Sequence, residues 1–342
     1  MRKITIRDIA YEAKVSISTV SRVLNSTKEV SPELKKQVFK VIKKHDFRPN
    51  QIARSLVTRK TGMIAIIISN ISNTVFGAMS KGIDSVCSQR DYILIVCDSN
   101  NNTENEIKLL RAMNNRQIDG LLFAGFDVTG DIVKEIRAQK YPTVLITQEM
   151  SEAGAEKPMP TVVNDNIQAT KDAIHFLYDN GHRKIAFIGG RKKDFSSGQK
   201  RFSGYRQALK ELGLEYKKNY VIHGDFTFES GYNCMKKILE KNPELPTAVM
   251  VCSDLMAIGA MNYLDKVDVK VPDTISIMGF DDIESASQVR PKLSTVRVSY
   301  FQEGALAAQT LFSLIEKQEI PMGTTYVPHE IIQRQSVRNI TA

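Results

Sequence analysis

The 342-residue sequence contains no tryptophan, only four cysteines and only five histidines. The cysteines, Cys87, Cys97, Cys234 and Cys252, are scattered without Cys-x-x-Cys pairing, and most lie among apolar residues. This pattern predicts buried, reduced thiols rather than disulfides or metal ligands. The histidines also lack metal-ligand spacing, so the sequence predicts no metal and no other cofactor.

Long apolar runs and an export signal are missing as well. The apolar run at residues 63–68 is far shorter than the roughly 20 residues that a membrane span requires. The N-terminal charges are not followed by an apolar core and a small-residue cleavage site, so we expect a cytoplasmic protein. The glycines at residues 189–198 lack the spacing of a phosphate-binding loop, and no catalytic triad or paired-carboxylate motif stands out. The sequence therefore does not predict an enzyme.

Positive charge, by contrast, is concentrated near the N-terminus. Residues 1–60 contain 15 lysines and arginines against five acidic residues, whereas the net charge of the whole chain is +9. The remaining residues are therefore close to neutral. A basic segment attached to a near-neutral remainder is the charge distribution of a DNA-binding domain.

Within this basic segment, residues 5–25 predict two short helices joined by a tight turn. Thr5 can cap the first helix, with Asp8 completing a capping box in which glutamate would be usual, and Ser16 can cap the second. The second helix has apolar residues at helical spacing on one face, and small polar residues with one arginine on the other. The polar face suits the DNA major groove. Serine can donate or accept a hydrogen bond, isoleucine can contact a thymine methyl group, and Arg22 can bind guanine or phosphate.

The candidate DNA-binding residues on these two helices are Thr5, Ser16, Ile17, Ser18, Thr19, Ser21, Arg22 and Asn25. An ordinary helical hairpin with a solvated polar face is the alternative interpretation. Ser31 and Pro32 then predict the start of a third helix, which would complete a small core. The predicted inner face of this third helix consists of Leu34, Val38, Val41 and Ile42.

From Gly62 onward, short apolar runs alternate with amphipathic stretches. The spacing of about 25 to 30 residues predicts βαβ units with parallel sheets. Two groups of such runs predict two lobes, with the Gly/Pro/acid-rich stretch at residues 152–160 between them. The predicted strands are residues 64–68, 92–96, 120–124 and 143–146, followed by 185–188, 220–222, 248–251 and 275–278.

Ligands of doubly wound sheets bind beyond the carboxyl ends of the strands, so the residues after each apolar run are the candidates. Arg201 and Asp281 could each hold two adjacent hydroxyls of a sugar, because a guanidinium and a carboxylate both form paired hydrogen bonds. Phe76 and Phe226 offer flat apolar faces for a sugar ring or a base. The candidate ligand-binding residues are Asn70, Asn73, Phe76, Thr147, Phe195, Ser197, Arg201, Phe226, Ser253, Asp254 and Asp281.

Each of these assignments has a purely structural alternative. Arg201 begins a predicted helix and could be solvated there, and Asp281 could cap a loop. Phe76 and Phe226 could be core residues. Asp254 could be a helix cap that holds the wall of the site in place, because the LMAIGA segment after it is helical in character.

Two N-terminal stretches, ITIRDIAYEAKVSISTVSRVLN and RPNQIARSLVTRKTGMIAIII, resemble the lactose-repressor/galactose-repressor family of bacterial transcription regulators. GHRKIAFIGG, RFSGYRQAL, SDLMAIGA and ISIMGFDDIESAS extend the resemblance across nearly the full length. The resemblance implies an all-α helix-turn-helix head followed by a two-lobed α/β domain with parallel sheets, like a periplasmic sugar-binding protein. It also implies that Arg201 and Asp281 contact the effector.

The resemblance further implies a hinge helix after the head, paired with its copy in a dimer. Leu56 would wedge into the DNA minor groove there, with Asn50, Ala53 and Arg54 beside it. From the residues alone, a plain linker is the alternative. The implied domains are a head at 1–49, a hinge at 50–61, a first lobe at 62–162 with 293–320, and a second lobe at 163–292 with 321–342.

The sequence departs from the family pattern at four places. Lys14 stands in the turn where glycine or asparagine is usual, and Ser69-Asn70 stands where Pro-Asp is common. Thr74-Val75-Phe76 stands where Pro-Phe-Phe is common, and Thr147 stands where aspartate is frequent. Fewer carboxylates leave fewer acceptors for hydroxyls. This argues against a simple neutral hexose and leaves room for a sugar with an anionic or amino substituent.

The sequence and the resemblance together predict a repressor that binds a pseudo-palindromic operator in double-stranded DNA and is controlled by a sugar or sugar derivative. No leucine heptad follows QRQSVRN, so we expect a homodimer. A DNA-binding regulator controlled by a partner protein is an alternative. A secreted sugar-binding receptor is less favoured, because it would not explain the basic head.

Overall fold

The computed structural model describes residues 4–25, 30–47, 60–150 and 158–341. The chain divides into two compact units, Met1–Thr61 and Gly62–Ala342. Some of the predicted DNA-binding residues are not among the described residues. The residues Asn50, Ala53, Arg54 and Leu56 and the side chain of Asn25 lie outside the described part of the chain.

The first unit contains the three predicted helices, α1 (Ile6–Glu12), α2 (Ile17–Asn25) and α3 (Pro32–Lys44). The capping box at the start of α1 is present. The Thr5 hydroxyl accepts from the Asp8 backbone N–H at 3.4 Å, and the Asp8 carboxylate accepts from the Thr5 backbone N–H at 2.8 Å. The start of α1 is therefore fixed by local sequence alone.

The turn between α1 and α2 is tight and is supported by α3. Lys14 has a φ of 49°, in the left-handed region that disfavours residues with a Cβ, so its departure from the family pattern carries some strain. The Ser16 hydroxyl accepts from the backbone N–H of Thr19 at 3.1 Å and caps α2 as predicted. Gln37 of α3 donates from Nε2 to the carbonyl oxygen of Ala13 at 2.8 Å, which ties the end of α1 to α3.

The core of the first unit draws residues from all three helices. Val38 and Val41 of α3 are buried and Ile42 is partly buried, as predicted. The prediction for Leu34 is wrong: it is 36% exposed, because it lies in the first turn of α3, beyond the end of this small core. The buried core residues are Ile9, Ala10, Ala13, Val20, Val23, Val38 and Val41.

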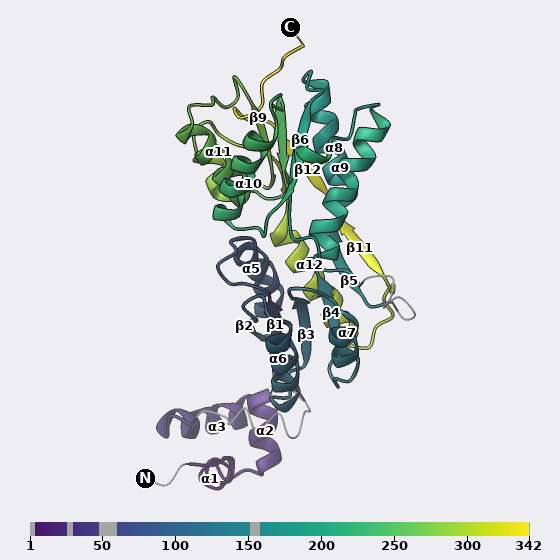
Figure 1. The fold of residues 1–342 in the computed structure, drawn as a ribbon. Coiled ribbons are helices and arrows are strands. Elements are labelled where there is room, and N and C mark those ends of the chain that lie inside the picture. The colour runs from purple at the N-terminus through teal and green to yellow at the C-terminus, as the bar shows by residue number, and fades with distance from the viewer. Residues whose placement is uncertain (1–3, 26–29, 48–59, 151–157, 342) are drawn as a thin grey trace. The chain divides into compact units, whose positions relative to one another are not determined.

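The second unit contains two six-stranded sheets with helices packed against them (Figure 1). The first sheet is parallel throughout, in the order β11-β5-β4-β3-β1-β2. Its strands are β1 (Met63–Ile68), β2 (Ile93–Asp98), β3 (Gly120–Ala124), β4 (Thr143–Ile146), β5 (Thr161–Asn164) and β11 (Thr324–Val327). The helices of this lobe are α5 (Val75–Ser88), α6 (Thr103–Asn115), α7 (Gly130–Arg137) and α12 (Tyr300–Ile315).

Alternate residues of β1 enter two different cores, which explains why the strand is apolar throughout. Ile64, Ile66 and Ile68 pack on the side of α5 and α12, whereas Ala65 and Ile67 pack on the side of α6 and α7. A parallel sheet that is covered on both faces requires this composition.

The second sheet has the order β12-β10-β9-β8-β6-β7 and is parallel except for the pair β10 and β12. Its strands are β6 (Ile185–Gly189), β7 (Val221–His223), β8 (Ala248–Val251), β9 (Ser276–Asp281), β10 (Ser294–Val298) and β12 (His329–Ile332). Helices α8 (Asn166–Asp179) and α9 (Lys200–Glu211) cover one side, and α10 (Phe228–Lys241) and α11 (Asp254–Lys266) cover the other (Figure 1). Short helical turns are η2 (Phe195–Gln199), η3 (Lys218–Tyr220) and η4 (Glu284–Ser287).

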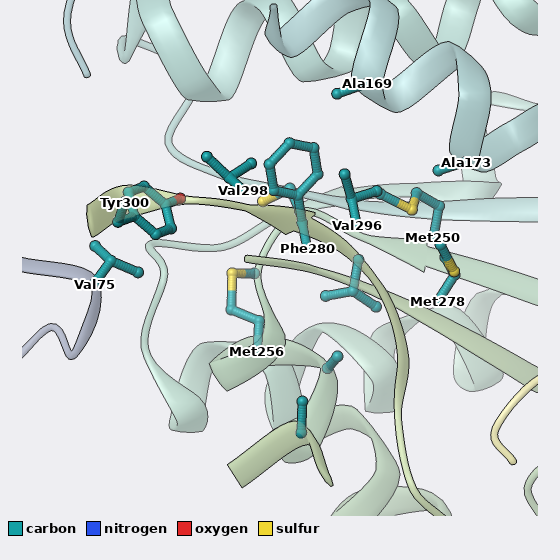
Figure 2. Packing of buried hydrophobic residues seen from close by; sticks show 14 of the residues in the cluster. Val75, Ala169, Ala173, Met250, Met256, Met278, Phe280, Val296, Val298 and Tyr300 are labelled. Carbon is teal, nitrogen blue, oxygen red and sulfur yellow. The ribbon is translucent and has the colours of Figure 1, made fainter. Parts of the chain in front are cut away.

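Figure 2 shows the interior of this second lobe, where strand side chains fill the space between α8 and α11. Tyr300 and Val75, at the starts of α12 and α5 of the first lobe, lie close together and belong to the same apolar cluster as these second-lobe residues. The apolar core therefore reaches the boundary between the lobes. The labelled residues are Val75, Ala169, Ala173, Met250, Met256, Met278, Phe280, Val296, Val298 and Tyr300.

The chain crosses between the lobes at different positions from those predicted. β5 ends at Asn164, β10 pairs with β9 of the second lobe, and β11 pairs with β5 of the first. The segments 293–298 and 321–327 are therefore exchanged relative to the prediction. The reason is that each strand is assigned by a long-range partner rather than by its own residues. The crossings fall at Asp165, Ser299 and Pro328.

The cysteine side chains are free thiols, and Cys87, Cys234 and Cys252 are buried as predicted. Burial raises the pKa of Cys87 and of Cys234 to about 11, so both stay protonated near neutral pH. Within the described residues, none of the helices combines the length and the apolar character that crossing a membrane would require.

Candidate functional site

The face of α2 that carries the predicted DNA contacts is accessible. Ile17 is 46% exposed, and Ser18 and Arg22 are exposed as well. Val20 and Val23 on the other face are buried in the core of the first unit. The helix therefore divides into a packing face and an accessible face, as its sequence predicts.

Several hydroxyls of the predicted set already have local partners. Ser16 Oγ lies 2.7 Å from Ser18 Oγ and 2.8 Å from Thr19 Oγ1. The Thr5 hydroxyl donates to the Asp8 carboxylate at 2.7 Å. Ser21 is half-buried, and its side chain is less accessible than that of Arg22. The structure thus gives Thr5 and Ser16 capping roles and leaves Ile17, Ser18 and Arg22 as exposed candidates without such a role.

A cavity of about 200 Å³ lies between the two lobes of the second unit. It is lined by residues that follow the carboxyl ends of strands from both sheets, where ligands of this architecture bind. Phe195 and Asp254 do not line it. The predicted residues that do are Asn70, Asn73, Phe76, Thr147, Ser197, Arg201, Phe226, Ser253 and Asp281.

Arg201, Asp281 and Tyr300 form a buried polar cluster at the base of this cleft. Arg201 Nη1 lies 3.6 Å from Asp281 Oδ1, and the Tyr300 hydroxyl donates to the same oxygen at 2.6 Å. Burial raises the pKa of Asp281 to about 6, against the opposing effects of Arg201 and the Tyr300 hydroxyl. The carboxylate is therefore mostly ionised near neutral pH, and it can still accept a hydrogen bond from a ligand.

Arg201 is held in place by groups outside the cavity. Its Nε donates to Asn166 Oδ1 at 2.7 Å, Nη1 donates to the carbonyl oxygen of Cys252, and the guanidinium lies 3.6 Å from the centroid of the Phe280 ring. The alternative of a solvated arginine is thereby excluded, because the side chain is buried. A fixed guanidinium can present its remaining N–H groups to a ligand at low entropic cost.

Two predicted ligand residues have structural roles instead. Asp254 is fully buried and accepts from the Thr295 hydroxyl at 2.6 Å and from the Ile283 backbone N–H at 2.9 Å. It therefore holds the loop that follows Asp281. The alternative of a helix cap is wrong, because the cap of α11 is Ser253, whose hydroxyl accepts from the Met256 backbone N–H at 3.3 Å. Phe195 begins the η2 turn, which places Ser197 at the cavity and Phe195 beside Lys200 instead.

The aromatic candidates differ in character. Phe76 lines the cavity but is mostly buried, so it serves the core as well as the cleft. Phe226 has a φ of 71° and is half-buried. A Cβ at Gly190 would overlap its ring, so this glycine allows the ring to lie against the backbone. Phe226 is consequently the more accessible flat surface.

The first-lobe wall contains polar side chains that mainly shape its loop. The side-chain oxygen of Asn70 accepts from the Ser72 backbone N–H at 2.8 Å, and that of Asn73 accepts from the Val75 backbone N–H at 3.3 Å. Both residues line the cavity. These side chains can donate to a ligand while their oxygens stabilise the turn.

Thr147 is held by a buried carboxyl group. It has a φ of 60°, and its backbone N–H donates to Glu303 Oε1 at 3.1 Å. Glu303 is fully buried, and burial raises its pKa to about 8 although the Thr147 N–H lowers it. Glu303 is therefore largely protonated near neutral pH, and it does not replace the carboxylate that residue 147 lacks.

The sequence prediction missed two cavity residues with distinct chemistry. Arg191 lies two residues beyond the end of β6, and its guanidinium lies 4.0 Å from the Phe126 ring centroid and 5.4 Å from that of Phe226. Asn164 ends β5, is 3% exposed, and its Oδ1 has no hydrogen-bond partner among the described residues. Arg191 could have been found, because it follows a predicted strand. Asn164 could not, because its strand was not predicted.

Acidic groups lie near Arg191 and reduce the net positive charge of this part of the cavity. The carboxylates of Asp194, Asp225 and Asp127 all act on it electrostatically, yet its burial lowers the pKa of the guanidinium below its usual value. The Asp194 carboxylate caps η2 by accepting from the Ser197 backbone N–H at 2.9 Å, and the Asp225 carboxylate accepts from the Thr227 backbone N–H at 3.1 Å in the turn before α10. Among the described residues no cluster of His, Cys, Asp or Glu is placed to hold a metal ion.

Comparisons with known proteins give two matches. Residues 5–50 match the family described as bacterial regulatory proteins, lacI family, and residues 174–337 match the periplasmic binding protein-like domain. The chain is 35% identical over 335 residues to catabolite control protein A of Priestia megaterium, covering 98% of this chain and 99% of that protein. Both matches agree with the order of the two units in the structure.

Solved structures are also similar. A complex of the transcriptional regulator CelR with cellobiose has a TM-score of 0.75 at 26% identity, covering 97% of this chain and 99% of that one. A lac repressor dimer, solved with operator and the anti-inducer ONPF, has a TM-score of 0.89 at 22% identity, covering 98% and 100%. At that lower identity, the second likeness shows the fold alone.

Proposed function

The chain belongs to the lacI family of bacterial regulatory proteins, and we propose that it represses transcription as a homodimer under the control of a small polar effector. The relatives are transcriptional regulators rather than enzymes, in agreement with the sequence prediction. The observation that carries the proposal is the combination of an accessible reading helix in one unit with a polar cleft in the other. A receptor without DNA-binding activity would need only the polar cleft.

The DNA side of the proposal assigns base contacts to Ile17, Ser18 and Arg22. Their exposure, on a helix whose other face is buried, supports this assignment. In the proposal the head spans residues 1–49 and the hinge spans residues 50–61, with Leu56 at the centre of the operator. Two heads of a dimer would then read two half-sites of a pseudo-palindrome.

The effector side of the proposal assigns ligand contacts to the cleft. Arg201 and Asp281 supply a fixed donor and acceptor pair, and Phe226 supplies a flat apolar face for a sugar ring. Buried Asn164 Oδ1 can accept from a ligand hydroxyl or ammonium group. The complex of CelR with cellobiose supports a carbohydrate as the chemical class. Arg191 together with Asp194 and Asp225 leaves open both an anionic and an amino substituent on the sugar.

The dimer side of the proposal rests on the edge strand β2. Ile93 and Val96 on this strand are 60% and 41% exposed, which is unusual for a strand of a parallel sheet. A second copy of the chain would cover such side chains. Effector binding would change lobe closure and thereby the spacing of the two hinges. A coupling of about 1 to 3 kcal/mol corresponds to about a 5- to 150-fold change in operator affinity.

The test is fluorescence anisotropy of the purified full-length protein on pseudo-palindromic duplexes from upstream of its own gene, at fixed salt. A panel of sugars, amino sugars, sugar acids and sugar phosphates is added in turn. We expect one compound to change operator affinity, and Asp281→Ala to bind DNA without this response. Asp273→Ala, an exposed carboxylate change in the same lobe, is the control.

Two outcomes would contradict the proposal at different points. If no duplex is preferred over a scrambled sequence, the DNA assignment fails. If operator binding is tight but no compound changes it, the small-molecule assignment of the cleft gives way to control by a partner protein.

A further inference from the structure

A second hollow surface lies on the second lobe, away from the cleft between the lobes. It consists of two adjoining hollows of about 780 Å³ and 500 Å³ that share Gln199, Phe202 and Tyr216. We call this surface the basic groove. It runs along α9 and the strand β7, and none of its lining residues lines the effector cleft.

The charge of the basic groove is of one sign. Its lining contains five cationic side chains and no carboxylate. Residues 61–342 as a whole are close to electrically neutral, so this is a local concentration rather than a general property of the second unit. The five cations are Lys192, Arg206, Lys210, Lys218 and Lys241.

Nearby carboxylates do not neutralise these cations. Glu244 is paired with Lys184 and Lys217, and Glu215 lies 3.8 Å from Lys217. Glu211 is paired with Lys171 at 2.8 Å. None of the five groove cations forms an ion pair with a described residue. Their charge is thus available to a partner.

The floor of the groove is apolar and aromatic. Phe202 and Tyr216 lie with ring centroids 6.5 Å apart, and Tyr216 is exposed. Val221 and Ile222 of β7 also line the groove. β7 is the outermost strand of its sheet, so in the described part of the chain one of its edges has no neighbouring strand. Free backbone groups on such an edge can pair with an added strand.

We propose that the basic groove binds an extended acidic segment of a partner protein. Carboxylates of the segment would face Lys218, Lys241 and the other cations, while its apolar side chains would contact Phe202 and Tyr216. The segment would add to the free edge of β7 by main-chain hydrogen bonds. A small anion would use the charges but neither the apolar floor nor the strand edge.

The groove belongs to the second lobe, whereas β2 belongs to the first lobe. Ile93 and Val96 of the proposed dimer surface are not among the residues that line the groove. This site is independent of the effector cleft, so a regulator with this groove could receive a protein signal as well as a small-molecule signal.

The probe is a fluorescein-labelled peptide of about ten residues that alternates glutamate with valine, a pattern suited to one strand. Its anisotropy is followed on titration with the full-length protein. Two comparison peptides replace glutamate by lysine or valine by glycine, and an oligothymidylate of the same length serves as a general polyanion. We expect the glutamate–valine peptide to bind most tightly, with an affinity that falls as salt rises.

Two charge variants distinguish peptide binding at the groove from peptide binding elsewhere on the protein. Lys218→Glu with Lys241→Glu reverses two groove charges, and Lys108→Glu with Lys140→Glu makes the same net change at exposed lysines of the first lobe. We expect the groove variant to bind the peptide at least about tenfold more weakly than the control variant. If the peptide instead bound to the basic first 60 residues, its affinity for the two charge variants would be the same.

Tyr216→Ser tests the apolar half of the proposal at an exposed position and should weaken peptide binding about threefold or more. Equal affinities of the two charge variants would overturn the proposal. So would loss of oligothymidylate binding in parallel with peptide binding, which would indicate a polyanion site, or no effect of Tyr216→Ser. Circular dichroism of each variant confirms that the fold is retained.

Discussion

Arg22 is exposed on α2, next to a helix face that is buried in the core of the first unit. An arginine that binds a guanine edge is worth about 1 to 3 kcal/mol of discrimination between bases. We therefore expect Arg22→Ala to lower affinity for the operator by about 10- to 100-fold and affinity for a scrambled duplex by much less. Anisotropy at one salt concentration measures both. Lys108→Ala removes a positive charge from the first lobe and should change neither.

An unchanged ratio of the two affinities in Arg22→Ala would remove Arg22 from the base-reading set. A uniform loss on both duplexes would place its guanidinium on the phosphate backbone instead.

Glu303 determines a pH dependence of stability. Its folded pKa of about 8 is raised above the usual value of 4.5, so its contribution to stability is complete below about pH 4.5 and is lost as the pH rises through 8. Glu303→Gln keeps an acceptor for the Thr147 N–H but has no charge to bury. We expect urea denaturation to show the variant gaining stability relative to the native chain between pH 5 and pH 8.

The difference in the free energy of unfolding between the native protein and Glu303→Gln should be small at pH 5. It should approach at most about 5 kcal/mol at pH 8. Burial also raises the pKa of Glu106 to about 7, but this residue is common to both proteins. Parallel pH profiles for the two proteins would show that Glu303 is ionised in the folded chain throughout.

At the scale of elements, α5 and α12 approach so closely that a Cβ at Gly82 would overlap the carbonyl oxygen of Phe301. Gly77 lies in the same helix, but a Cβ there meets nothing within 4 Å. We expect Gly82→Ala to destabilise the protein by about 1 to 3 kcal/mol through overpacking. Gly77→Ala should stabilise it by about 0.5 to 1 kcal/mol, because alanine is the better helix former.

Thermal unfolding of the two variants, followed by circular dichroism, makes this comparison. Stabilisation of both variants would mean that helix propensity, rather than the close approach of α5 and α12, determines the effect at Gly82.

The elements that were predictable carry their own signals. The capping box of Thr5 and Asp8, the Ser31-Pro32 start of α3 and the all-apolar β1 are local patterns, and each lies where the sequence placed it. β5, β10, β11 and β12 were not predicted, because short strands at lobe crossings are defined by their partners. The same cause moved the lobe boundaries.

The residues of the cleft likewise divide into those that the sequence could predict and those that it could not. Nine of the eleven predicted ligand residues line one cavity, because the strand ends could be located from sequence. Asp254 was misassigned because its hydrogen bonds to Thr295 and Ile283 join segments about 30 to 40 residues away, as the sequence separations of 41 and 29 show. Such bonds leave no local pattern.

At the scale of the whole second unit, the lobes are joined by three crossings and by side-chain contacts across the cleft. Lys200 of the second lobe pairs with Glu149 of the first, and the Glu149 backbone N–H donates to Ser196 Oγ at 2.7 Å. Arg191 of the second lobe lies over the Phe126 ring of the first. These contacts stabilise the arrangement of the lobes in the structure against opening of the cleft.

Phe126 offers a way to change this balance without altering the effector cavity, which it does not line. A cation–π contact is worth about 0.5 to 2 kcal/mol, so Phe126→Ala should favour opening and weaken effector binding by about 2- to 30-fold. Small-angle scattering without effector should show a larger radius of gyration. Titration with the compound that changes operator affinity should show the weaker binding.

Tyr178→Ala is the matched control, because it removes a cation–π contact with Arg183 that lies within the second lobe, at 3.5 Å. This variant should change neither the scattering nor the effector affinity. If Phe126→Ala behaves like the control, the contact of Arg191 with the first lobe does not hold the lobes together. If effector affinity falls but the radius of gyration does not change, Phe126 acts on the pocket through the orientation of Arg191 rather than through closure.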